Sequence, residues 1–262
     1  MGVPKPDLDF RLHFVERAPL FRGLSPAAHS ELLVLAHERR VARKQCFLEE
    51  GEPAREILIL CAGRVKMTQL APSGQQIILR LTGPGEVFGG LGVARGGTYP
   101  ATAEALEPSH ALGWSRAELH AFAETHPLVL QNTIRIVSER LRSLEHRYLE
   151  LATERVPQRL AHALLRLVGH MGRPADGGAL VSFSREELAQ MTGTTLFTVS
   201  RIVSEWETHG LVLPRREGVV VVDTEGLVSV AEGAESFPQS GAAGAEQNAG
   251  ASSATSRAAA RR

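Results

Sequence analysis

The residues with the clearest chemical pattern lie between positions 184 and 212, in the segment SREELAQMTGTTLFTVSRIVSEWETHGLV. Ser184 and Glu187 have the S-x-x-E spacing of a capping box, which predicts the first turn of a helix. Gly193 follows four residues after the small Ala189, a spacing that suits the turn of a helix-turn-helix. Apolar residues at i, i+3, i+4 and i+7 then predict the buried stripe of a second helix: Val199, Ile202, Val203 and Trp206.

The opposite face of this second helix carries side chains that suit contacts with DNA. Arg201 can donate two hydrogen bonds to a guanine edge in the major groove, and Phe197 can pack on a thymine methyl. The alternative for Phe197 is packing against the wing or a neighbouring helix. The predicted DNA-contact residues, including flanking arginines, are Thr195, Leu196, Phe197, Thr198, Ser200, Arg201, Ser204, Arg185, Arg215 and Arg216.

A heptad pattern precedes this segment, between residues 128 and 154. Large side chains recur at alternating spacings of four and three residues: Leu130, Ile134, Val137, Leu141, Leu144, Tyr148 and Leu151. The repeat predicts a helix of about 27 residues, roughly 40 Å long, with one apolar edge. Two partners for that edge stay open: the chain's own β-domain, or the same helix of a second copy in a parallel coiled coil.

The rest of the chain predicts the scaffold that positions these helices. Residues 8–40 look helical and amphipathic, with Ser25 as an N-cap before Pro26. Short apolar runs separated by glycines, from residue 41 to 114, predict antiparallel strands, and residues 211–222 predict a hairpin wing. We therefore predict an α+β protein with a β-roll sensor domain and N-terminal helices in 1–126, a dimerisation helix in 127–155, a winged helix-turn-helix in 156–231 and a disordered tail in 232–262.

The composition narrows the classes of function. The 262 residues are 43% hydrophobic and 22% charged, without an apolar run that would span a bilayer and without a signal-peptide pattern. We expect a cytoplasmic protein with no membrane partner. The two cysteines lack pair or metal spacing, and no nucleophile–base pair or phosphate loop is present. We expect no enzyme, no catalytic residue and no metal site; with a formal net charge of zero, DNA contact would rest on geometry.

Taken in order, the β-roll, the long helix and the winged helix-turn-helix resemble the Crp/Fnr superfamily of bacterial transcription regulators. The segments that carry the resemblance, besides the helix-turn-helix, are LFRGLSP, EEGEPAREILILCAGRVKM, PSGQQIILRLTGPGEVFGGLG and YPATAEALEPS. The resemblance implies a jelly roll like that of cyclic-nucleotide-binding domains, which holds an effector. It also implies a homodimer that reads a palindrome in double-stranded DNA, with RNA polymerase as a further candidate partner.

The implied effector pocket departs from that of cAMP-binding relatives, whose phosphate cassette resembles F-G-E-L-[AG]…R-[ST]-A. Gly90 replaces the Glu, and Tyr99 and Pro100 stand about where the Arg and the hydroxyl residue belong. A buried phosphate would lose its bidentate partner, so cAMP is not expected. The candidate pocket residues are Phe88, Gly89, Gly90, Leu91, Gly92, Tyr99, Pro100, Ala101, Arg140 and Leu144.

The resemblance leaves other effectors open. An iron–sulfur cluster is not expected, because no cysteine precedes Cys46. The run YPATAEAL resembles the nitric-oxide-responsive, haem-associated branch of the family, which makes haem a candidate cofactor, although no spacing marks an axial histidine. A regulator without a ligand is the remaining alternative.

The recognition helix also departs from its relatives, many of which carry [RP]-E-T-[VIF]-[SG]-R where this chain has LFTVSR. Leu196 and Phe197 replace the polar pair, so the family's cytosine contact should be lost. We predict a half-site unlike TGTGA or TTGAT. The alternative function is a ligand-binding regulatory or scaffold protein with a vestigial helix-turn-helix.

Overall fold

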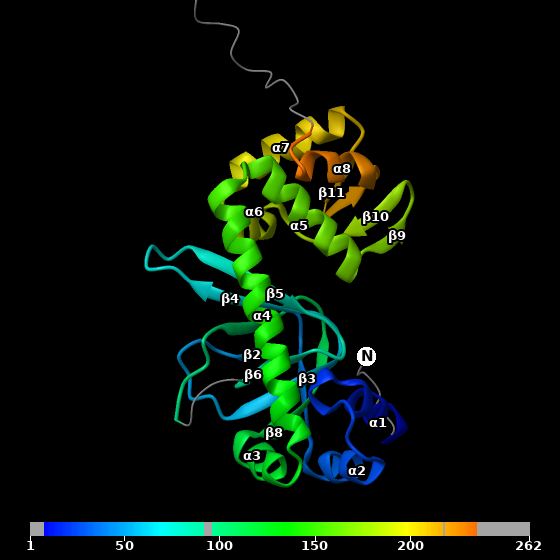
Figure 1. Ribbon diagram of the computed structural model, residues 1–262. Coiled ribbons are helices and arrows are strands. Elements are labelled where there is room, and N and C mark those ends of the chain that lie inside the picture. The colour runs from blue at the N-terminus through cyan, green and yellow to red at the C-terminus, as the bar shows by residue number, and fades with distance from the viewer. Residues whose placement is uncertain (1–7, 92–95, 217, 235–262) are drawn as a thin grey trace, which may run out of the picture.

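The computed structural model of the protein describes residues 8–91, 96–216 and 218–234 (Figure 1). Gly92 of the predicted effector pocket and residues 235–262 of the predicted tail lie outside this range. A β-rich lobe and a smaller, mainly helical lobe are joined by one long helix, α4 (Leu128–Thr153), which runs from the far end of the β-rich lobe to the second lobe. The predicted α+β class is confirmed.

The N-terminal helices are shorter than the sequence predicted. Helices α1 (Leu8–Arg17) and α2 (Pro26–Leu35) flank a 3-10 turn, and Ser25 caps α2 through a 3.2 Å bond from the Ala28 N–H. The helical prediction for residues 36–40 was wrong, because His37–Val41 forms strand β1. It pairs with a strand some 70 positions later, a partner that local periodicity does not reveal.

Two four-stranded antiparallel sheets form the predicted β-roll, in the orders β1-β8-β3-β6 and β2-β7-β4-β5. The strands are β2 (Cys46–Leu48), β3 (Glu56–Ala62), β4 (Val65–Leu70), β5 (Gln76–Thr82), β6 (Val87–Gly89), β7 (Thr102–Ala105) and β8 (Ser109–Ser115). Leu58, Leu60 and Phe88 are fully buried between the sheets. Gly74 closes the β4–β5 hairpin with a positive φ of 82°, a conformation that favours glycine.

Helix α4 is fixed to the β-rich lobe along its first turns. It follows α3 (Arg116–Thr125), which begins at a Ser115–Glu118 capping box. Asn132 is buried and its side-chain amide donates to the carbonyls of Leu20 and Arg22, at 3.1 and 2.9 Å. Val129 and Ile136 pack into the same core. One side of α4 is therefore packed against the β-rich lobe of the same chain.

The second lobe is a winged helix-turn-helix, as predicted. Its elements are α5 (Val156–Met171), β9 (Arg173–Ala175), β10 (Gly178–Val181), α6 (Arg185–Thr192), α7 (Leu196–Thr208), β11 (Val212–Arg215), β12 (Gly218–Val221) and α8 (Thr224–Ala231). Leu160, Phe183 and Trp206 fill its core. The unpredicted α8 starts at the Asp223 cap and buries Leu227, because its short apolar stretch finds a partner in α5.

The two lobes touch through buried charge as well as apolar contact. Lys66 of β4 is buried, and its ammonium lies 3.3 Å from Glu104 of the same lobe and 3.6 Å from Glu187 of α6. Arg173 at the start of β9 forms a second bridge, 3.0 Å from Glu107. Leu81 packs against the core of the second lobe. Helix α6 is therefore in direct contact with the β-roll.

Substitution of Glu187 isolates this contact. Glu187→Gln keeps a residue that completes a capping box with Ser184, but removes the charge that faces Lys66. We expect a loss of about 1 kcal/mol in the free energy of unfolding, because Lys66 retains Glu104. Urea denaturation measures the loss, with the neighbouring exposed Glu186→Gln as control. Equal stability of the two variants would show that the bridge does not hold the lobes together.

Candidate nucleic-acid interface and effector pocket

The turn between α6 and α7 sets the angle at which α7 is presented. Ser184 accepts the Glu187 N–H at 3.1 Å, which is the predicted capping box. Gly193 ends α6 in the left-handed region, with φ 63° and ψ 42°. Thr195 caps α7 by accepting the Thr198 N–H at 3.1 Å. Figure 1 shows α7 at the end of the molecule away from the β-roll.

Helix α7 has one buried and one open face. Its predicted apolar stripe is buried: Val199, Ile202, Val203 and Trp206. Phe197 is 79% exposed, and the neighbouring Leu196 is also exposed. Phe197 is therefore not packed on the wing or on another helix, which was the predicted alternative. Leu196 and Phe197 together form an exposed apolar patch at the start of α7, and such patches mark candidate interaction surfaces.

The other predicted DNA contacts gather around this face. Arg201 and Ser204 lie four and seven positions after Phe197, on the same side of α7, and both are exposed. Arg215 and Arg216 are exposed at the turn of the β11–β12 wing. The remaining members lie closer to the protein: Ser200, Thr198 and Arg185 are half-buried, and the exposed Thr195 shares a 2.9 Å hydrogen bond with the Thr198 hydroxyl.

The heptad residues of α4 form a single exposed seam. All seven side chains are 40–71% exposed: Leu130, Ile134, Val137, Leu141, Leu144, Tyr148 and Leu151. The side of α4 that packs on the β-roll carries different residues, such as Val129 and Ile136. The seam therefore does not pack against the chain's own β-domain, which was the alternative partner.

Two described positions of the cassette, Tyr99 and Gly90, are closely packed by the chain itself. Tyr99 is 4% exposed, and its hydroxyl oxygen accepts the backbone N–H groups of Arg55 and Glu56 at 3.1 and 3.0 Å. A Cβ at Gly90 would lie 2.9 Å from the Arg116 side chain, so a larger residue there would have to displace it. The Tyr99 hydroxyl is thus bonded to the backbone at the start of β3, and the Arg116 side chain lies against Gly90.

The structure does not gather all the predicted pocket residues. Phe88 and Ala101 are buried, Gly89 and Leu91 are half-buried, and Pro100 is exposed. The Arg140 guanidinium donates to the Val87 carbonyl from α4. Leu144 belongs instead to the exposed seam.

Sequence reasoning missed two arginines at the junction of β5 and α4, Arg80 and Arg147. Burial, followed by the charge of Arg140, lowers the pKa of Arg80 to about 10. The Arg147 guanidinium donates to the Leu79 carbonyl. The sequence did offer one signal, because Arg80 is the one charged residue in the apolar strand QIILRLT. Arginine is seldom buried in such a strand unless it is paired. The β5–α4 junction therefore holds three arginines, Arg80, Arg140 and Arg147, with the carboxylate of Glu86 as an opposing charge near Arg80 and Arg140.

The described parts of the chain show neither a metal site nor a membrane-spanning helix. No group of three or more His, Cys, Asp or Glu residues there has metal-binding geometry. Within the same ranges, no helix combines the length and apolar character needed to cross a bilayer.

Comparisons with known proteins agree with this architecture. The sequence matches the Cyclic nucleotide-binding domain family over residues 38–126 and the Crp-like helix-turn-helix domain family over 158–230. It is 31% identical to a Cyclic AMP receptor protein of Thermus thermophilus, over 74% of this chain and 88% of that one. It is 27% identical to a CRP-like cAMP-activated global transcriptional regulator of Mycobacterium tuberculosis, over 80% and 95%. The fold superposes on a CRP-family transcriptional regulator of T. thermophilus with a TM-score of 0.66 at 28% identity, over 74% and 96%.

Two glycines test whether the α6–α7 turn is conformationally constrained. Gly193→Ala forces an L-residue into the left-handed region and should cost about 1–2 kcal/mol of stability. Gly169→Ala is the matched control, because Gly169 is exposed within α5 and has open space around it. Alanine there should stabilise by roughly 0.5–1 kcal/mol. Thermal denaturation separates the two, and the same sign for both variants would contradict the assignment of the turn.

Proposed function

This chain belongs to the Crp/Fnr family of transcription regulators, and we propose that it is a homodimer that reads a palindromic operator without depending on cAMP. The observation that carries the proposal is the open face of α7. Phe197, Arg201 and Ser204 share that face, while the opposite stripe anchors the helix in the lobe core. A capped helix that exposes both an arginine and a phenylalanine suits the major groove.

Each side chain of the open face has a separate role in the proposal. Arg201 donates to two acceptors on a guanine edge, and Phe197 covers a thymine methyl. The backbone N–H groups of Leu196 and Phe197, at the start of α7, and the wing arginines Arg215 and Arg216 meet phosphates, which set the register without specifying sequence. With leucine and phenylalanine at the first two positions of α7, the proposed half-site differs from TGTGA and TTGAT.

The proposed dimer forms along α4. Seven large exposed side chains at heptad spacing match the seam of a parallel two-stranded coiled coil. Two copies related by a two-fold axis would present two α7 helices to successive major grooves. An inverted repeat is the sequence that matches such symmetry.

Independence from cAMP rests on the chemistry of the cassette. The names of both curated relatives mention cAMP. In this chain, Tyr99 directs its hydroxyl at the backbone, and a side chain at Gly90 would meet Arg116. Tyr99 and Pro100 stand where the cAMP-binding pattern has an arginine and a hydroxyl residue, so a buried phosphate would lose that bidentate partner, at a cost of several kcal/mol. Another effector is therefore required if the β-roll is to act as a sensor.

Selection of binding sites from random duplexes tests the DNA proposal. We expect an inverted repeat whose half-sites are centred about 10 base pairs, one helical turn, apart, or a multiple of it. Arg201→Gln should weaken binding about 10- to 100-fold and relax selection at one base pair per half-site, whereas Arg142→Gln on α4 should change neither. Recovery of TGTGA or TTGAT at full affinity would refute the half-site, and the absence of any selected sequence would favour a scaffold with a vestigial reader.

Replacement of a seam leucine tests the dimer. Leu141→Asp puts two facing carboxylates into the seam and should weaken the dimer by about 3 kcal/mol, roughly 100-fold or more in dissociation constant. Arg142→Asp, one position away on the wet side of α4, is the control for charge and helix propensity. Sedimentation equilibrium measures both. Equal dissociation constants for the two variants would exclude the seam as the dimer contact.

A further inference from the structure

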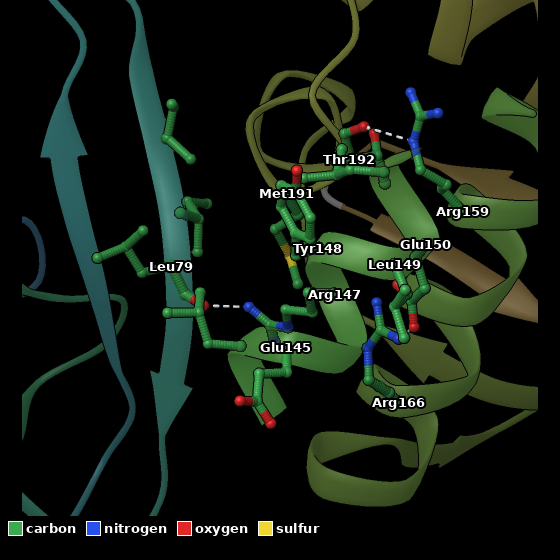
Figure 2. Close-up of a pocket in the computed structure, with 14 residues that line it drawn as sticks. Leu79, Glu145, Arg147, Tyr148, Leu149, Glu150, Arg159, Arg166, Met191 and Thr192 are labelled. Atoms are coloured by element: carbon green, nitrogen blue, oxygen red, sulfur yellow. Dashed lines mark hydrogen bonds and ion pairs between the residues drawn. The ribbon is translucent and has the colours of Figure 1, made fainter. Parts of the chain in front are cut away.

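A cavity of about 750 Å³ lies where the β-roll, α4 and the second lobe meet (Figure 2). Its walls are mainly apolar and come from β5, the C-terminal half of α4, α5 and α6. They include Ile77, Leu79, Tyr148, Leu149 and Met191. A volume of this size is typical of sites for small organic ligands, which occur preferentially between domains. The cavity is separate from the cassette that holds Tyr99.

Positive charge borders this apolar space. Figure 2 shows the Arg147 side chain reaching from α4 toward β5, where it donates to the Leu79 carbonyl. Burial lowers the pKa of the Arg147 guanidinium, and the nearby charge of Arg166 lowers it further. Arg166 also lines the cavity, and its guanidinium is paired with Glu150 at 2.5 Å. Guanidinium groups beside an apolar space suit a ligand that carries negative charge.

Two carboxylates line the cavity, Glu145 and Glu150, and they do not balance its three arginines, Arg147, Arg159 and Arg166. Glu150 is already engaged, because Arg166 lies 2.5 Å and His146 3.0 Å from its Oε1. Arg159, which also lines the cavity, donates to backbone carbonyls of Glu154 and Thr192. Arg147 itself has only a neutral acceptor, and it adds to the charge of Arg80 further along β5. The cavity therefore combines an apolar lining with excess positive charge.

We propose that this cavity binds an organic anion. Its apolar body lies against Leu79, Leu149 and Met191, and its acidic head group accepts hydrogen bonds from Arg147 and Arg166. Carboxylate, phosphate and sulfonate heads share the required chemistry, since each offers several anionic oxygens to guanidinium donors. A cation of the same shape would be repelled.

A ligand in this position would contact the β-roll, the second lobe and the long helix that joins them. The cavity wall includes Leu79 of β5, Arg147 of α4, Arg166 of α5 and Met191 of α6. A molecule that binds one arrangement of the lobes more tightly shifts the population toward it. The proposal that an organic anion binds is argued from the cavity alone. The effector role rests in addition on the proposed function in DNA reading.

One side of the cavity belongs to the seam. Leu144, Tyr148 and Leu151 line the space and are also heptad residues, so a second copy in the proposed dimer would close that side. The competing occupant is therefore the partner itself, whose side chains would fill the cavity and leave no room for a ligand. Measurements on the full-length dimer separate the two occupants.

The test uses two fluorescent dyes with related naphthyl-phenylamine bodies. 8-Anilinonaphthalene-1-sulfonate carries an anionic head, and N-phenyl-1-naphthylamine is neutral. We expect one saturable site per protomer for both dyes. Arg147→Gln should weaken the sulfonate dye about 10-fold, the loss of one charge-assisted hydrogen bond, and leave the neutral dye unchanged. Arg142→Gln, an exposed arginine of the same helix, should change neither.

A second variant keeps the test decisive if Arg147→Gln disturbs folding. Leu149→Trp fills the cavity and should remove both dyes while sedimentation and thermal unfolding remain those of the wild type. Absence of a saturable site in the dimer, or sulfonate binding that neither Arg147→Gln nor Leu149→Trp changes, would overturn the proposal. Operator affinity is measured separately by fluorescence anisotropy without dye, so failure of DNA reading and failure of the cavity are distinguishable.

Discussion

The exposed seam of α4 is the constraint on which the rest of the structure depends. Seven large side chains between Leu130 and Leu151 are 40–71% exposed in the described part of the chain. Burial of one such side chain contributes about 1.5–3 kcal/mol, so the open seam favours the proposed dimer. A second copy is the partner that matches a heptad repeat, because the same spacing recurs on its own α4.

The seam connects to DNA reading through the end of the same helix. Helix α4 ends at Thr153 and α5 begins at Val156, so the second lobe is attached by a short connection. The Lys66–Glu187 contact and the Arg173–Glu107 bridge then seat that lobe on the β-roll. A dimer along α4 would fix the separation of the two α7 helices, and the cavity at Arg147 would be the point at which a ligand could adjust it.

Local periodicity predicted the parts of the fold that have a local cause. The heptad of α4, the stripe ending at Trp206 and the Ser184–Glu187 capping box are each contained within one helix, and each appears where the pattern indicated. Strand β1 was missed because its pairing partner lies far along the chain. The cationic cavity was missed for the same reason: its lining comes from four elements, β5, α4, α5 and α6, and only tertiary packing brings Arg147 and Arg166 together.

Cysteine scanning along α4 tests the central claim most directly. With Cys46→Ser removing the partly exposed native thiol, single cysteines are placed at the four C-terminal seam positions, Leu141, Leu144, Tyr148 and Leu151, and at two positions outside the seam, Glu139 and Arg142. In a parallel coiled coil each seam residue faces its own copy, so mild oxidation should link chains at all four seam positions and at neither of the others. No linkage at the seam, or equal linkage at Glu139 and Arg142, would contradict the account.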